Sequence, residues 1–163
     1  MPGEKATLPN SLVEIHDLAF DFCLNLKEVV LPEKLAMIGA CAFECCESLA
    51  QINIPASVVE IREYAFVSCE QLTGIWVDEN NANYSSDAYG VLFNKDKTQL
   101  FMAPGALSGT YSVADGVQEI WPNAFVTCYN LEEVIIPASV TSLTSGSFSY
   151  CKVTVSEDNT AYT

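Results

Sequence analysis

Residues 54–72 read I-P-A-S-V-V-E-I-R-E-Y-A-F-V-S-C-E-Q-L, and this stretch decides the fold because its pattern recurs along the chain. The recurring columns lie 23 residues apart: Leu8-Pro9, Leu31-Pro32 and Ile54-Pro55; Ile15, Ile38 and Ile61; Ala19-Phe20, Ala42-Phe43 and Ala65-Phe66; Cys23, Cys46 and Cys69; Leu26, Leu49 and Leu72. The pattern returns as Ile120, Ala124-Phe125, Cys128, Leu131 and Ile136-Pro137, and in a weaker form as Leu143, Phe148 and Cys151. Columns that share one period identify an internal repeat.

Each repeat predicts a short strand, a turn and a short helical segment. Val29 and Leu31 alternate with Glu28 and Val30, as expected for a strand with one buried face. Pro32 follows and ends the strand, because proline lacks a backbone donor. The A-F-x-x-C-x-x-L spacing is typical of one face of a helix. A unit this short cannot bury its apolar face alone, so the copies are expected to stack.

The columns of residues 54–72 resemble the BspA-like (Treponema-type) leucine-rich repeats of bacterial surface proteins and some protozoan parasites. The resemblance covers nearly the whole chain. It implies an α/β repeat solenoid, a right-handed leucine-rich-repeat superhelix of roughly six coils. Short strands are expected on one face and short helical turns on the other.

We predict one domain over residues 1–163, with regular coils at 1–77, a hairpin-bearing coil at 78–112 and further coils at 113–163. The long coil follows from a gap of 36 residues between Val77 and Val113, where the repeat predicts 23. Inside this gap, residues 90–93 and 99–102 are apolar and flank the polar connector 94–98. Two strand-like runs around a short polar connector favour a β-hairpin, which we expect to protrude with an exposed turn.

Residues 77–85 are echoed by residues 155–163, 78 positions later. The chain therefore stops where a second hairpin coil is expected to begin, and it starts within a strand. Solenoids need polar capping repeats, and neither end of the sequence shows one. We expect the chain to be a piece of a longer array.

Composition excludes several classes of protein. The chain has 21 acidic and 7 basic residues and a net charge of −14, which disfavours binding to nucleic acid. Half of its residues are hydrophobic, which is the opposite of a disordered chain. No apolar run approaches the roughly 20 residues that cross a bilayer, so no membrane insertion is predicted.

The seven cysteines and the single histidine suggest no active site. Five cysteines share one repeat column and are expected to form a buried ladder: Cys23, Cys46, Cys69, Cys128 and Cys151. Cys41 and Cys45 lie outside that column, as a chance pair or a weak metal site, and we favour chance. His16 shares its column with Gly39, Arg62 and Trp121, which marks a variable surface position. The acidic loop 78–83 lacks the order of a calcium loop, so we interpret it as a turn.

We therefore predict no catalytic residue, no metal ligand and no cofactor. The positions left for binding are those that face outward from the strands. The candidate protein-binding surface consists of Lys27, Glu28, Gln51, Asn53, Thr73, Trp76, Glu132 and Glu133. Trp76 stands out because tryptophan is enriched among interface hot spots. The alternative for Trp76 is packing under the hairpin against Phe93 or Phe101.

The family resemblance implies a secreted or cell-surface protein that mediates adhesion or binds a host protein. The first hypothesis is therefore a non-catalytic module that binds an extracellular or host protein. The second is a structural spacer that binds nothing itself. The third is glycan binding through Trp76, Tyr84 and Tyr89, which form a sparse stacking platform.

Overall fold

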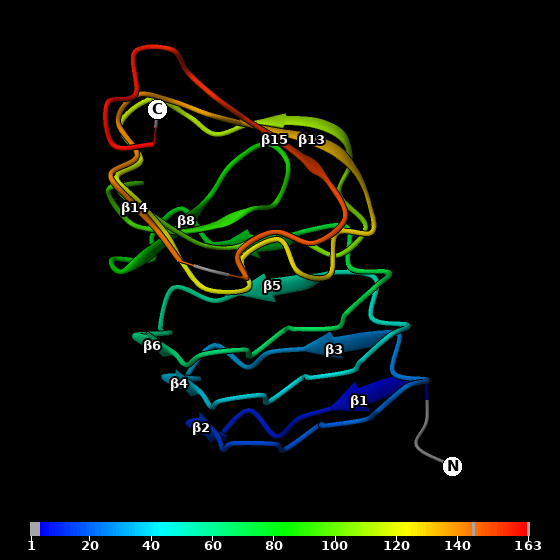
Figure 1. The fold of residues 1–163 in the computed structure, drawn as a ribbon. Coiled ribbons are helices and arrows are strands. Elements are labelled where there is room, and N and C mark those ends of the chain that lie inside the picture. The colour runs from blue at the N-terminus through cyan, green and yellow to red at the C-terminus, as the bar shows by residue number, and fades with distance from the viewer. Residues whose placement is uncertain (1–3, 145, 163) are drawn as a thin grey trace.

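The computed structural model describes residues 4–144 and 146–162, which form a β-solenoid of about seven turns, called coils below. The coils lie on one another from the N-terminus at the bottom of Figure 1 to the C-terminus at the top. The first strands of the coils are β1 (Lys5–Thr7), β3 (Glu28–Val30), β5 (Ile52–Ile54), β7 (Ile75–Val77), β11 (Ser108–Ser112), β13 (Asn130–Ile136) and β15 (Lys152–Val155). The second strands are β2 (Glu14–Ile15), β4 (Met37–Ile38), β6 (Glu60–Ile61), β10 (Gln99–Met102), β12 (Glu119–Ile120) and β14 (Ser142–Leu143). The predicted solenoid is confirmed.

Neighbouring coils pair in parallel at the register that the repeat predicts. The second strands place Ile15 opposite Ile38 and Ile38 opposite Ile61. Among the first strands, Ile52 lies opposite Ile75. Because the pairing register equals the repeat length, each sequence column becomes a column of stacked side chains.

The predicted helical turns are wrong, because the described residues contain no helix and thus none that could cross a membrane. Leu18 and Phe22 have φ angles of 62° and 54°, in the left-handed region that a right-handed helix excludes. Positive φ recurs in the same two columns at Cys41, Tyr64, Asn123 and Gly146, and at Cys45, Ser68 and Tyr150. The N–H of Phe20 donates to the carbonyl of Ala42 in the next coil instead of closing a helical bond. A chain of turns therefore produces the spacing of three and four residues that a helix also gives.

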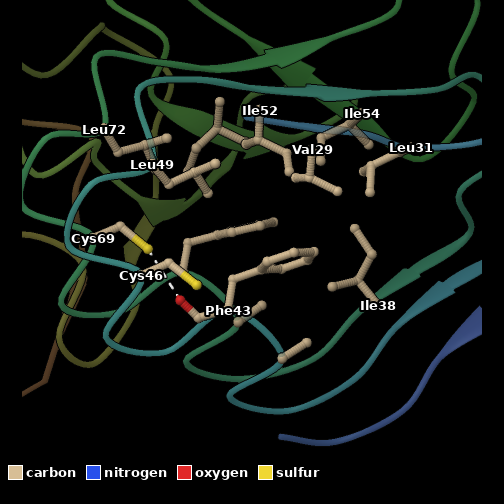
Figure 2. Packing of buried hydrophobic residues seen from close by; sticks show 14 of the residues in the cluster. Val29, Leu31, Ile38, Phe43, Cys46, Leu49, Ile52, Ile54, Cys69 and Leu72 are labelled. Carbon is tan, nitrogen blue, oxygen red and sulfur yellow. Dashed lines mark hydrogen bonds between the residues drawn. The ribbon is translucent and has the colours of Figure 1, made fainter. Parts of the chain in front are cut away.

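The core consists of the repeat columns, and Figure 2 shows it in the first coils. Val29 and Leu31 are buried while Val30 is 60% exposed, which confirms the predicted alternation. Phe43 stacks between Phe20 and Phe66, with ring centroids 5.0 and 5.6 Å away. Burial of such columns is the main favourable contribution to folding.

The hairpin is present but does not protrude. Strands β9 (Leu92–Asn94) and β10 pair antiparallel, and a further strand that we did not predict, β8 (Tyr84–Ser86), pairs with β9. Strand β10 also pairs in parallel with β12, so it serves as the second strand of its coil. The side chains of Val91, Leu92, Phe93 and Leu100 are at most 2% exposed. Residues 78–112 thus form part of the solenoid wall, because these apolar side chains fill its interior.

The apolar residues form two clusters. The first belongs to the N-terminal stack, our name for residues 4–77, and also includes Leu92 and Met102. The second belongs to the C-terminal stack, residues 78–162, where the aromatic column resumes with Phe125 and Phe148 and where Tyr111 of β11 packs against Phe125. The aromatic column is therefore interrupted between Phe66 and Phe125.

The sequence echo has a structural counterpart. The side-chain amide of Asn81 donates to the carbonyls of Pro55 and Val58, at 2.9 and 3.0 Å. Asn159 makes the same pair of bonds, to Pro137 and Val140, both at 2.9 Å. The hydroxyls of Tyr84 and Tyr162 accept from the N–H groups of Ile61 and Leu143. Thr163, the last residue of the echo, lies outside the described residues.

Candidate functional site

Outward side chains of the first strands form exposed columns, and we call this surface the strand face. Strand pairing places Thr7 beside Val30, Asn53 beside Trp76 and Ile135 beside Thr154. A second column includes Lys5 beside Glu28 and Glu133 beside Lys152. Because the register repeats from coil to coil, side chains far apart in the sequence become lateral neighbours.

The structure divides the predicted surface into two groups. Six of the eight residues lie on or next to β3, β5 and β7: Lys27, Glu28, Gln51, Asn53, Thr73 and Trp76. Glu132 and Glu133 lie on β13. Segment 86–90 borders β7, where the N–H of Ile75 donates to the carbonyl of Gly90 at 2.9 Å. The six residues therefore form one contiguous patch, from which the two glutamates are separate.

Ion pairs reduce the negative charge of the strand face. Lys5 pairs with Glu28 at 2.7 Å, and Lys27 pairs with Glu4 at 2.9 Å. On the separate group, Lys152 donates to Glu133 and lowers the pKa of that carboxyl. Exposed pairs of this kind contribute roughly 0–1 kcal/mol to stability. They leave the strand face with charges of both signs, although the whole chain is strongly acidic.

Trp76 lies across the backbone of Gly74. A Cβ atom at Gly74 would be 2.3 Å from the indole Cε2 atom, so glycine makes room for the ring. Among the described aromatic rings, Phe101 packs against Tyr84 and Trp121, and none packs against Trp76. The predicted alternative, packing of Trp76 against Phe93 or Phe101, thus has no ring contact to support it among the described residues. Trp76 is half-buried, and the indole forms part of the strand face.

The three aromatic residues of the glycan hypothesis do not form a common platform. Tyr84 packs edge-on against Phe101, with ring centroids 5.9 Å apart, and its hydroxyl accepts from Ile61. Tyr89 packs edge-on against the buried Tyr111. No ring contact joins Trp76 to either tyrosine within the described chain. A stacked sugar would therefore find only single exposed rings at these positions.

The cysteines of this column are free thiols, and the predicted burial holds for Cys46, Cys69 and Cys128, whereas Cys23 and Cys151 at the two ends of the ladder are only partly buried. The thiols of Cys46 and Cys69 donate to the carbonyls of Phe20 and Phe43, one coil below, and Figure 2 shows the second bond. Burial raises the pKa of the Cys46 thiol to about 12, and that of Cys128 likewise to about 12. A neutral, hydrogen-bonded thiol is a poor nucleophile and a poor metal ligand. The column thus has a structural role.

The other polar candidates also have structural roles. Asp78 accepts from the N–H of Asn80 at 2.8 Å, and Asn81 is fully buried in backbone contacts, which confirms a turn at residues 78–83. The His16 side chain is exposed, with its Nε2 atom 3.7 Å from the Glu14 carboxylate. Across residues 4–144 and 146–162, no three histidine, cysteine or carboxylate side chains gather as a metal site would require.

A narrow cleft lies where the two stacks meet, on the side of the second strands. It is lined by Ile61, Arg62, Glu63, Tyr64, Ala65, Phe66, Leu92, Phe101, Met102, Trp121 and Pro122. Its inner cavity has a volume of about 40 Å³, and it widens towards Ala40 and Glu60 into an open groove of about 380 Å³. At its mouth, the Arg62 guanidinium donates to Glu60 at 2.8 Å and to Asp17 at 3.2 Å.

Sequence reasoning missed this cleft. Its ring pair, Phe101 and Trp121, has centroids 4.3 Å apart. Phe101 lies on β10, inside the long gap in the repeat, and Trp121 directly follows β12. Trp121 shares a column with His16 and Arg62, and the sequence marked that column only as variable. The one available signal was the gap of 36 residues, because a coil of irregular length cannot cover the coil beneath it in register.

Parallel coils of 23 residues, with apolar columns inside and variable columns outside, define the protein as a leucine-rich-repeat solenoid. The profile of the BspA type leucine rich repeat region matches residues 3–102 and 106–157, in six copies. The chain belongs to this BspA-type leucine-rich repeat family.

Solved structures of bacterial proteins share the fold. The leucine-rich repeat protein of Treponema pallidum is 30% identical, with a TM-score of 0.61 over 95% of this chain and 70% of that one. A leucine-rich cell surface protein of Faecalibacterium prausnitzii is 28% identical, with a TM-score of 0.80. The match covers 92% of this chain but 41% of that protein's length. A comparison with curated proteins gives no match.

The pneumococcal vaccine antigen PcpA is similar in fold alone, at 23% identity and a TM-score of 0.70. That match covers 88% of this chain and 42% of the PcpA chain. Solved structures with this fold thus include one bacterial protein described as a cell surface protein and one described as a vaccine antigen.

Proposed function

We propose that the chain is a non-catalytic protein-binding module of a bacterial cell-surface or secreted protein, and that it acts in adhesion or host-protein binding. The observation that carries this proposal is the strand face of the N-terminal stack, where variable side chains stand in register on a rigid core. That patch combines charged and polar side chains with the exposed Val30 and the indole of Trp76. The surface location of the Faecalibacterium relative supports the same placement for this chain.

The chemistry of the strand face favours a protein partner. Interfaces contain aromatic anchors surrounded by polar and charged residues, and a rigid surface loses little entropy on binding. Trp76 is such an anchor, with Asn53 beside it in the register of β5 and β7. The neutral thiols and the exposed His16 offer no activated nucleophile or base, which supports a module without catalysis.

Binding of this chain to a panel of immobilised extracellular matrix proteins tests the proposal. We expect saturable binding to at least one of them, weakened about tenfold or more by Trp76→Ala. The matched control is Tyr129→Ala, which removes a 50% exposed ring outside the strand face and is expected to leave the affinity unchanged. A folded chain that binds nothing on the panel would support the spacer hypothesis. Equal affinity of the wild type and Trp76→Ala would remove the strand face as the site.

A further inference from the structure

Each coil of the N-terminal stack donates backbone hydrogen bonds to the coil above it in a fixed pattern. In the second coil, the N–H of Cys41 donates to the carbonyl of Glu63 at 3.2 Å, and that of Phe43 donates to Ala65 at 2.8 Å. The first coil repeats the pattern at the equivalent positions. The carbonyls of each coil therefore serve as the acceptors for the coil beneath it.

At the third coil this pattern loses its acceptors. Tyr64 and Phe66 correspond to Cys41 and Phe43, yet their N–H groups have no acceptor among the described residues. The N–H groups on either side of this pair have side-chain acceptors instead. On one side, the N–H of Ile61 donates to the Tyr84 hydroxyl at 2.8 Å. On the other flank, the N–H of Ser68 donates to a threonine hydroxyl of the C-terminal stack at 2.9 Å. Phe66 is only 2% exposed, and buried N–H groups without an acceptor are rare in proteins.

Tyr64 and Phe66 belong to the wall of the cleft between the stacks. From the equivalent N–H groups in the stack, we infer that this cleft binds an extended peptide segment of a partner protein. Carbonyls two residues apart on the peptide accept from Tyr64 and Phe66, as those of Glu63 and Ala65 accept in the coil below. The inner cavity of about 40 Å³ admits a carbonyl or a methyl group, and the outer groove of about 380 Å³ admits side chains. The peptide would thus be recognised through main-chain hydrogen bonds, as in β-augmentation, where an extended segment adds to an existing backbone edge.

Charge at the mouth of the cleft selects a neutral or basic segment over a free anion. The carboxylates of Asp17, Glu60 and Glu63 outnumber the single guanidinium of Arg62, which already pairs with two of them. Like charges repel an incoming carboxylate or phosphate, whereas a peptide carbonyl is neutral. Glu63 is exposed and is suited to pair with a lysine or arginine of the peptide. The cleft lies beside the second strands, so this inference is independent of the proposed strand-face function.

Amide hydrogen exchange followed by NMR tests the inference on the intact chain. The probe is a capped peptide Arg-Glu-Tyr-Ala-Phe-Val, the sequence of residues 62–67, because this segment supplies the acceptors to the coil below. In the free chain, the amides of Tyr64 and Phe66 are expected to exchange at least tenfold faster than those of Cys41 and Phe43. Saturating peptide is expected to slow exchange at Tyr64 and Phe66 by at least tenfold.

Two variants distinguish the cleft from other surfaces. Trp121→Ala removes a ring of the groove and is expected to weaken peptide binding at least fivefold, whereas Tyr129→Ala is expected to leave it unchanged. The inference is overturned if the peptide shifts neither amide at millimolar concentration, which would leave only water as the acceptor. It is also overturned if acetate or phosphate protects these amides and the peptide does not. Protection that depends only on the concentration of the chain would identify a second copy as the occupant.

Discussion

The regular N-terminal stack and the junction above it contain the same repeat but satisfy its polar groups differently. Within the stack, each coil supplies the acceptors, the ring partner and the register for its neighbour, as for Phe43 between two other rings. At the junction the spacing is 36 residues instead of 23, so the next coil arrives out of register. Side chains of Tyr84 and Asn81 then replace some backbone partners, and Tyr64 and Phe66 are left without one. A break in the repeat thus turns structural backbone groups into a potential recognition site.

The largest expected effect is a difference in stability between a substitution in the middle of the N-terminal stack and one at its upper boundary. Phe43→Ala is expected to lower the free energy of unfolding by about 3–5 kcal/mol, since the ring is fully buried between two others and leaves a cavity. Phe66→Ala is expected to cost less, because Phe66 stacks on Phe43 alone and borders the cleft, where neighbouring groups can relax. Urea denaturation of both variants measures the difference. Equal losses would show that the junction packs as tightly as the stack.

The next effect concerns the side chain that joins the third coil to the hairpin segment. Asn81 donates to Pro55 and Val58 and accepts from the N–H groups of Asn83 and Tyr84, all while fully buried. Asn81→Ala leaves these backbone groups unpaired, and we expect a loss of about 2–3 kcal/mol.

The neighbouring Asn80 provides the control for this prediction. Its side chain is exposed and donates to the Asp78 carboxylate at 3.2 Å, so Asn80→Ala is expected to change stability by less than about 0.5 kcal/mol. Thermal or urea unfolding compares the two variants under one condition. If they were equally stable, the buried amide would not be what joins the two segments.

Periodicity predicted the features that depend on the repeat length. The solenoid, its inward columns, the cysteine ladder and the hairpin strands all follow from apolar residues that recur at fixed intervals. The echo of residues 77–85 was also visible, and the structure gives it a function in the paired contacts of Asn81 and Asn159. These predictions succeeded because buried positions must be apolar in every coil and therefore appear as a periodic pattern in the sequence.

The failed predictions depend on backbone conformation and on contacts outside the repeat. A spacing of three and four residues fits both a helix and a chain of turns, and only the positive φ at residues such as Leu18 distinguishes them. No glycine marks most of these positions, so the sequence carries little signal of them. The hairpin was expected to protrude because its connector is polar, yet Phe93 and Leu100 fill the core. The cleft could not be predicted from the sequence, because only the three-dimensional structure shows which backbone N–H groups lack an acceptor.

The smallest expected effect compares the two tyrosines of the echo. Tyr84→Phe removes the acceptor for the Ile61 N–H in a half-buried place and is expected to cost about 1 kcal/mol. Tyr162→Phe removes the equivalent acceptor for Leu143, but Tyr162 is 38% exposed, so water can replace it and we expect almost no loss. Hydrogen exchange at the two amides is the sharper measurement, with faster exchange expected at Ile61 in Tyr84→Phe. Unchanged exchange at Ile61 would mean that the Tyr84 hydroxyl does not serve as the acceptor at the edge of β6. The run of unpaired N–H groups beside the cleft would then begin at Ile61 instead of Tyr64.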